Sequence, residues 1–144
     1  MRTGTPDRAT FDAERYVSLT TYRRDGTPVA TPVWFAMDGG ALVVLTDASS
    51  GKARRIGANA AVVVTPCDAR GKVHGDAWAA TARRLEPSAH ARVHQLLARK
   101  YGLVFRAFVG WTALDRRLRR RPAREEALLE VSFVPAEAGP AAQA

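Results

Sequence analysis

The sequence has little cysteine and no long apolar segment. Its one cysteine, Cys67, has no partner for an internal disulfide and cannot by itself form a thiolate zinc site. No run approaches the roughly 20 consecutive apolar residues of a membrane-spanning helix, and residues 1–16 lack the apolar core of a signal peptide. These absences argue against export and membrane insertion, so we expect a cytoplasmic protein.

The sequence also lacks the motifs of enzymes that catalyse reactions with side chains alone. It contains no Ser/His/Asp arrangement, no pair of carboxylates spaced for acid–base work, and no glycine-rich Rossmann or phosphate-binding loop. We therefore assign no catalytic residue. If the protein is an enzyme, we expect a bound cofactor to supply the difficult chemistry.

Acidic residues are few beside the basic ones: 14 against 22, for a net charge of +8. This surplus favours an anionic partner, such as nucleic acid, an acidic lipid, or a phosphorylated or carboxylated small molecule. An alanine- and arginine-rich composition is also typical of a GC-rich coding bias. Local basic clusters therefore carry more weight than the total charge.

The first half of the chain alternates β-type runs with turns. Residues 16–22 alternate in polarity, Asp25-Gly26 suits a tight hairpin turn, and residues 28–37 continue as a second strand. Pro28 and Pro32 cannot donate ladder hydrogen bonds, so one edge of this second strand is expected to lack a neighbouring strand. Further elements are expected as strands at 41–46, 60–66 and 72–85, with a possible bulge at Gly75, and as a short helix from Ser49 or Ser50 to Ala58.

The second half is helical before a closing strand. Apolar periodicity predicts helices at residues 88–102 and about 104–120, and a strand at 125–135. The expected apolar side of the second helix comprises Phe105, Phe108, Val109, Trp111, Leu114 and Leu118. The whole pattern indicates one domain over residues 1–144, with an N-terminal arm at 1–10 and a flexible tail at 136–144. We expect a small barrel or closed sheet of the α+β or all-β kind.

The stretch TDASSGKARRI, residues 46–56, holds the candidate anion site. On a helix that begins near Ser50, the side chains of Lys52 and Arg55 share one face, beside backbone amides that lack helical partners. Gly51 lets the backbone approach a ligand closely, whereas Arg54 points elsewhere. The alternative is a capped, solvated helix start without a ligand, and local sequence leaves both interpretations open.

Other candidate residues give weaker indications. Trp34 and Trp78 suit either stacking on a planar ligand or ordinary core packing. His90 and His94 have the spacing of helical metal ligands, but no carboxylate or cysteine accompanies them locally, so we expect no metal site. Cys67 has no identifiable base nearby, and we expect it to be a buried residue rather than a nucleophile.

The densest basic run is RRLRRRPAR, residues 116–124. It ends a predicted helix, where positive charge is favoured by the helix dipole. A basic nucleic-acid-binding module is one alternative function, although the chain has no helix-turn-helix, zinc-finger or RNA-binding signature. The run equally suits the acidic tail of a cofactor.

With these motifs in order, the chain resembles the pyridoxamine 5'-phosphate oxidase-like split β-barrel superfamily. The resemblance spans about Phe11 to Pro135, and its most specific part is LTDASSGKARRI followed by VVVTPCDARGKVHG. It implies a mainly β (α+β) fold of the flavin-reductase/FMN-binding-like kind, a split β-barrel with peripheral helices. The chain is most similar to the actinobacterial branch of flavin/deazaflavin oxidoreductases that use coenzyme F420. The C-terminal arginine and histidine pattern of true pyridoxamine phosphate oxidases is absent, so no vitamin B6 oxidase activity is expected.

The resemblance also implies a cofactor site. Gly51 stands where flavin-using relatives carry arginine, and Arg55, one turn later, is expected to replace that arginine's phosphate contact. The implied cofactor-binding residues are Thr31, Pro32, Val33, Trp34, Leu45, Thr46, Ser50, Gly51, Lys52, Arg55 and, from the partner of a homodimer, Trp78. The implied activity is hydride transfer between reduced F420 and an unsaturated small molecule. The alternatives on the same fold are an FMN-binding or haem-related protein.

Overall fold

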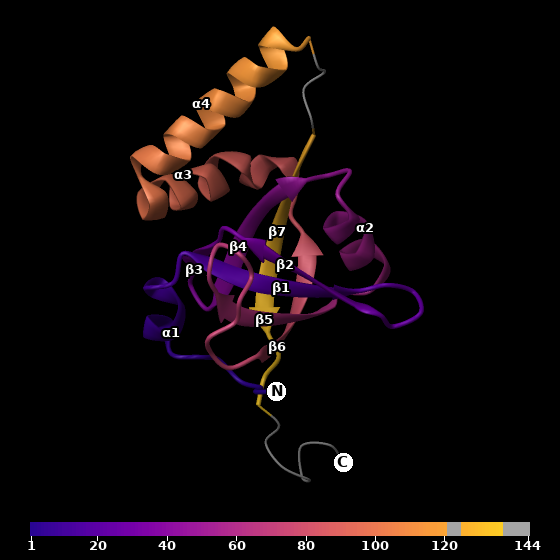
Figure 1. Cartoon of the computed structure of the whole chain (residues 1–144). Coiled ribbons are helices and arrows are strands. Elements are labelled where there is room, and N and C mark those ends of the chain that lie inside the picture. The colour runs from indigo at the N-terminus through magenta and orange to yellow at the C-terminus, as the bar shows by residue number, and fades with distance from the viewer. Residues whose placement is uncertain (121–124, 137–144) are drawn as a thin grey trace.

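A computed structural model describes residues 1–120 and 125–136 of the chain, and its centre is one curled sheet (Figure 1). The strand order is β2-β1-β5-β6-β7-β4-β3, and all neighbouring strands are antiparallel. The strands are β1 (Tyr16–Tyr22), β2 (Pro28–Val33), β3 (Ala36–Asp38), β4 (Ala41–Asp47), β5 (Ala61–Cys67), β6 (Trp78–Arg84) and β7 (Glu126–Phe133). The helices are α1 (Arg8–Asp12), α2 (Gly51–Ala58), a 3-10 turn (Pro87–Ala89), α3 (His90–Tyr101) and α4 (Leu103–Leu118).

The sheet curls around an apolar interior, so the expected α+β split barrel with peripheral helices is confirmed. Alternating residues of β1 and β4 enter this interior, together with Ile56 from α2, because each strand directs every second side chain inward. The interior core comprises Phe11, Val17, Leu19, Val33, Phe35, Leu42, Val44, Ile56, Val62, Val64, Trp78, Ala80, Ala82, Leu129 and Val131.

The β1–β2 hairpin forms where the sequence predicts it. Gly26 has a φ of 88°, which glycine adopts readily because it has no Cβ, and its N–H donates to the Arg23 carbonyl to close the turn. β2 pairs with β1 and ends the strand order, which confirms that Pro28 and Pro32 lie on an edge strand.

The single strand predicted over residues 28–37 is wrong, because the chain breaks at Trp34 and Phe35. β2 ends at Val33 and β3 begins at Ala36, and these two strands lie at opposite ends of the strand order. The Tyr101 hydroxyl occupies the break: it accepts a hydrogen bond from Phe35 N–H (3.0 Å) and donates to the carbonyl of Arg15 (2.7 Å) or Phe35 (2.9 Å). A side chain thus replaces a strand neighbour at this corner.

We expect Tyr101→Phe to lower the free energy of unfolding by about 1–3 kcal/mol. The change leaves the Phe35 N–H without its acceptor in a partly buried position, which is the costly way to lose a hydrogen bond. Urea denaturation measures the loss. Tyr22→Phe, at the far end of β1, is the matched control, and an equal loss in both variants would contradict the role of the Tyr101 hydroxyl.

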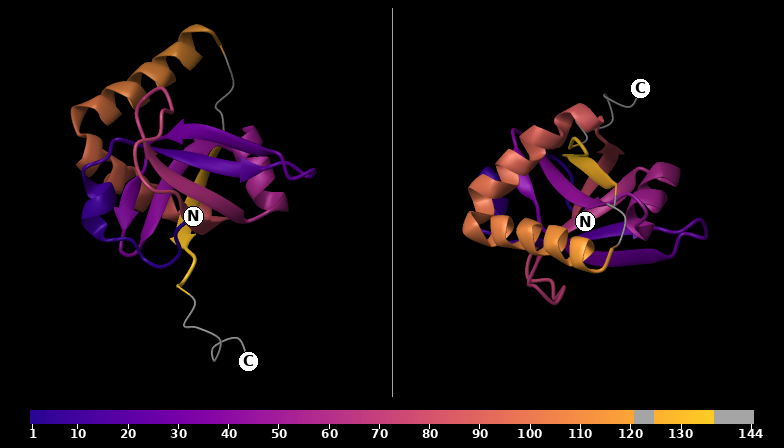
Figure 2. Two further views of the ribbon diagram at one scale, coloured as in Figure 1. Left: turned by 60° about the horizontal axis from the view of Figure 1, so that its bottom comes forward. Right: turned by 90° about the horizontal axis from the view of Figure 1, so that it is seen from above.

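Helices α3 and α4 form a pair over one end of the curled sheet (Figure 2). They meet at Gly102, which has a φ of 59° and ends α3 as predicted. Val93 and Leu97 of α3 and Phe105 of α4 are buried in a second core against Ala36, Val43 and Leu128. The sheet side of α4 is therefore narrower than the predicted apolar side: Phe108, Trp111, Leu114 and Leu118 are exposed.

β6 is shorter than the strand predicted over residues 72–85. Gly75 lies against Pro66, where a Cβ would come within 3.0 Å of the proline ring, so this glycine marks a close approach rather than a bulge. Within the arm expected at residues 1–10, Arg2 lies beside β6, because it exchanges backbone hydrogen bonds with Ala77 and Ala79, and residues 8–10 belong to α1. Most of the tail expected at 136–144 lies outside the described residues. Among the described helices, none is long and apolar enough to cross a membrane.

Candidate functional site

The residues of the predicted anion site lie at the start of α2. Ser50 caps the helix: its Oγ accepts a hydrogen bond from Ala53 N–H (3.3 Å) and lies 3.4 Å from the Thr46 hydroxyl at the end of β4. The cap therefore ties the first turn of α2 to the strand before it. Gly51 and Lys52 follow in the first turn, where backbone N–H groups favour an anion.

A groove of about 370 Å³ joins this helix start to the end of β2 and to the α3–α4 pair. Its lining is mostly apolar, with a lysine at the α2 end. The groove is lined by Tyr16, Pro32, Val33, Trp34, Leu45, Thr46, Lys52, Leu97, Phe105 and Phe108. Pro32, Val33, Trp34, Leu45, Thr46 and Lys52 were all predicted from the sequence as cofactor-binding residues, and the fold brings them together.

Trp34 provides the planar wall of the groove. Its ring stacks on Tyr101 with centroids 4.9 Å apart and planes 17° apart, and it also meets the tilted rings of Phe105 and Phe108 at 6.2 and 5.2 Å. These contacts fix the indole orientation, because a ring held between aromatic neighbours has few free rotamers. The groove thus presents a rigid aromatic surface to a flat ligand.

Lys52 supplies the positive charge of the groove. Burial lowers the pKa of its ammonium group below the ordinary value, the neighbouring Arg55 charge lowers it further, and Asp47 raises it. The Asp47 carboxylate is held at the turn, where it accepts hydrogen bonds from Ser49 N–H (2.8 Å) and Ser49 Oγ (2.6 Å). A bound anion beside Lys52 would offset the cost of burying this charge.

Arg55 lies across Gly51 on the same helix. Its Nε donates a 2.6 Å hydrogen bond to the hydroxyl of Thr21, which is fully buried on β1. A Cβ at position 51 would lie 2.5 Å from one guanidinium nitrogen, so the glycine leaves the space that the Arg55 side chain fills. The guanidinium therefore reaches the first turn of α2, where the sequence analysis expected it to replace an arginine. Arg54 is exposed, as predicted.

Five predicted residues do not line the groove: Ser50, Gly51 and Arg55 lie at the cap and on the body of α2, and the other two are Thr31 and Trp78. Thr31 is half-buried on β2 next to Pro32 but does not line the groove. Trp78 is 7% exposed in the interior core, where its ring meets Phe133 edge-on and Arg2 covers one face. The structure does not join Trp78 to the groove of its own chain, and burial leaves it little surface for a ligand across an interface.

Sequence reasoning missed four groove residues: Tyr16, Leu97, Phe105 and Phe108. Tyr16 begins a strand in a polar position, and the other three belong to helical apolar stripes that we had assigned only to packing. The unusual width of the α4 stripe was the available signal, because a helix that packs on one sheet face does not need apolar residues around half its circumference.

Comparison with known proteins agrees with this architecture. A sequence model described as pyridoxamine 5'-phosphate oxidase matches residues 7–131. No curated protein sequence matches the chain.

Several solved structures share the fold. The haem storage protein HutZ from Vibrio cholerae has a TM-score of 0.62 at 15% identity over 95% of this chain and 92% of its own. A putative pyridoxamine 5'-phosphate oxidase from Listeria innocua has a TM-score of 0.59 at 14% identity, over 87% of this chain and 88% of its own. A structure titled F420 reductase has a TM-score of 0.55 at 20% identity, over 90% of this chain and 95% of its own. At these identities the structural likeness establishes the fold alone. The sequence match over residues 7–131 establishes more: the chain belongs to the pyridoxamine 5'-phosphate oxidase family.

Proposed function

We propose that the protein is an F420-dependent oxidoreductase of the actinobacterial deazaflavin branch. It would transfer a hydride between reduced coenzyme F420 and an unsaturated small molecule. The observation that carries the proposal is the groove itself, which combines the aromatic wall of Trp34 with Lys52 and the first turn of α2 at one end. A planar ring system joined to a phosphate matches these two regions.

The chain's residues fit such a cofactor in three ways. The N-terminus of α2, Lys52 and Arg55 would bind the phosphate, since amides, an ammonium group and a guanidinium group are the usual phosphate ligands. Pro32 and Trp34 would contact the ring system at the unpaired edge of β2. A neighbouring hollow of about 330 Å³ shares Leu45, Thr46 and Phe108 with the groove. Arg116 in this hollow would meet an acidic tail, which would have to pass beside the carboxylates of Asp47, Glu125 and Glu126.

Reduced F420 supplies a hydride at its deazaflavin C5 for an electron-poor double bond. The residues of the groove would orient the two reactants and keep water from the aromatic wall, while solvent supplies the proton. None of the groove residues is assigned as a general acid or base. The shared fold with a structure titled F420 reductase supports the proposal, and the haem storage protein of the same fold makes haem the first alternative to test.

We also propose a homodimer with cofactor sites at the interface. The exposed apolar residues Phe108, Trp111, Leu114 and Leu118 of α4 support an association, because large contiguous apolar surfaces are uncommon on monomers. Light scattering coupled to gel filtration measures the mass, and a monomer at micromolar concentration would contradict this part of the proposal.

We expect the protein to bind F420 and Lys52→Ala to weaken that binding by about 10- to 100-fold. The change removes a charged hydrogen-bond donor from the phosphate end of the groove, and such a bond contributes about 1.5–3 kcal/mol. Fluorescence titration with purified F420 measures both dissociation constants. Arg54→Ala is the matched control: it removes an exposed positive charge from the same helix and should change affinity by less than about twofold.

Parallel titrations separate the alternatives. Binding of FMN or haem without F420 would replace the proposed cofactor, and equal losses in Lys52→Ala and Arg54→Ala would remove the proposed phosphate site. Strongly salt-dependent binding of DNA or RNA that F420 does not displace would favour a nucleic-acid-binding module instead.

A further inference from the structure

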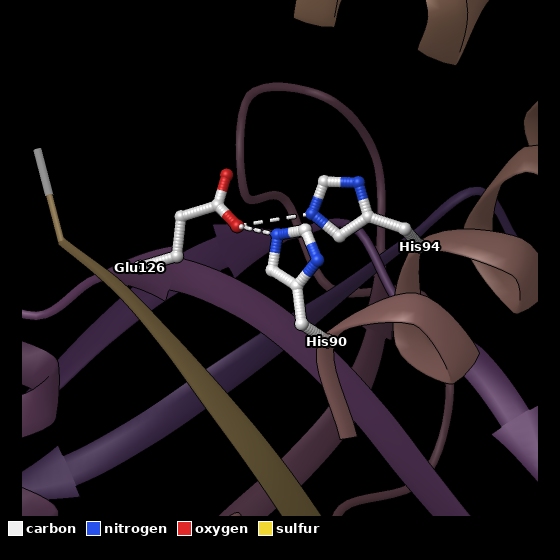
Figure 3. Close-up of side chains that lie close together, drawn as sticks. All are labelled: His90, His94 and Glu126. Atoms are coloured by element: carbon white, nitrogen blue, oxygen red, sulfur yellow. Dashed lines mark hydrogen bonds and ion pairs between the residues drawn. The ribbon is translucent and has the colours of Figure 1, made fainter. Parts of the chain in front are cut away.

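The side chains of His90 and His94, on α3, lie close to the side chain of Glu126, the first residue of β7 (Figure 3). The Glu126 Oε2 atom lies 2.7 Å from His90 Nε2 and 3.0 Å from His94 Nε2. The two imidazole rings are stacked, with centroids 4.0 Å apart and planes 27° apart. One potential ligand atom from each residue therefore lies within 4.8 Å of the others.

The three side chains are held by regular elements rather than by loops. One turn of α3 separates the two histidines and places both on the same helix face. Glu126 begins β7, a strand paired on both sides, and its direct partner on β4 is Asp47. The His94 ring also meets Phe105 edge-on at 5.6 Å, which restrains its orientation. Such preorganisation is what a metal site requires of its ligands.

We propose that His90, His94 and Glu126 bind one divalent first-row transition-metal ion, with Zn²⁺ as the representative. Two imidazoles and a carboxylate form a ligand set that suits zinc and iron(II). With metal–ligand bonds of about 2.0–2.1 Å, adjacent ligand atoms are about 2.9–3.4 Å apart. The observed separations of 2.7 and 3.0 Å approach this range, so small side-chain shifts admit an ion.

The site is accessible and leaves room for a further ligand. The side chains of His90, Glu126 and His94 are 54%, 32% and 21% exposed. His90 and Glu126 line a hollow of about 390 Å³, and Glu126 also lines the hollow that adjoins the groove. Three protein ligands leave at least one coordination position for water or a small molecule, which is the arrangement of open zinc sites. The ion would also fasten the start of α3 to β7.

Titration calorimetry with ZnCl₂ on untagged, chelator-treated full-length protein tests the site. We expect one Zn²⁺ per chain and a higher melting temperature with the ion bound. His94→Ala and Glu126→Gln should each weaken binding by more than about tenfold, because even loss of an outer ligand partner costs about 10- to 100-fold. Titration with Co²⁺ should give visible absorption bands that are lost in both variants.

His74→Ala is the matched control. His74 Nε2 lies 2.8 Å from Glu14 Oε2, so it forms a histidine–carboxylate pair that lacks a second imidazole. This variant should bind Zn²⁺ as the native protein does. Failure of the native protein to bind a stoichiometric ion, or equal binding by the native protein and His94→Ala, would overturn the proposal. Circular dichroism of each variant verifies that a loss of binding is not a loss of folding.

Discussion

Phe35→Ala is expected to lower the free energy of unfolding by about 3–5 kcal/mol. Phe35 is fully buried, its ring meets Phe11 edge-on at 6.2 Å, and its backbone is held by Tyr101. The change removes the side chain at the point where β2 and β3 separate, so the surrounding strands have little freedom to close the cavity. The free energy of unfolding of such a domain is about 5–15 kcal/mol in total, so this change would remove a large fraction of it.

Two further variants make the measurement specific. Phe108→Ala removes the same side chain from a groove position that is 52% exposed, and it should cost less than about 1 kcal/mol. Phe35→Leu keeps most of the volume and should cost about 1 kcal/mol if Phe35→Ala proves too unstable to measure. Urea denaturation of all three tests the order. Equal costs at positions 35 and 108 would show that Phe35 does not support the corner.

Local sequence predicted the features that depend on neighbouring residues. The Asp25-Gly26 turn, the Ser50 cap and the stop at Gly102 all follow from backbone preferences within a few positions. Pro32 indicated an unpaired edge for the same reason. Among the groove residues, Lys52 follows from the local helix start, whereas Pro32, Val33, Trp34, Leu45 and Thr46 were implied by the family resemblance rather than by backbone preferences.

Contacts between distant residues were beyond the reach of local patterns. The break after Val33 depends on Tyr101, which is 66 residues from Phe35 along the chain. The carboxylate beside His90 and His94 comes from Glu126, so the local segment HARVH gave no indication of it. Trp111 is exposed because it lies on the part of α4 that does not pack on the rest of the domain. An apolar stripe in the sequence predicts a contact but does not specify which element makes it.

Lys100 places a buried ammonium group against the Phe35 ring. Its Nζ lies 3.3 Å from the centre of the Phe35 ring and has no hydrogen-bond acceptor among residues 1–120 and 125–136. Burial lowers the pKa of Lys100 to about 8, although Asp12 and Glu14 act to raise it. The cation–π contact favours the charged form but does not replace the lost hydration in full.

Lys100→Met is therefore expected to stabilise the protein at pH 7 by about 1–2 kcal/mol. A lowering from 10.5 to about 8 corresponds to at most about 3 kcal/mol, which partial access of solvent and the Phe35 ring reduce. Methionine keeps the length of the side chain without its charge. Urea denaturation at a series of pH values compares the variant with the native protein.

The pH dependence of unfolding identifies why Lys100→Met is expected to be more stable than the native protein. Between about pH 8 and 10.5 the unfolded chain keeps the Lys100 proton that the folded chain has released, so native stability rises with pH and the advantage of Lys100→Met narrows. Burial raises the pKa of Tyr101 to about 12, so above pH 10 the unfolded chain loses that proton first and the stability of both proteins falls. Lys72→Met is the control at an exposed lysine, and it should change the free energy of unfolding at pH 7 by less than about 0.5 kcal/mol. A difference between native protein and Lys100→Met that stays constant from pH 7 to 10 would contradict a charge effect and indicate altered packing instead.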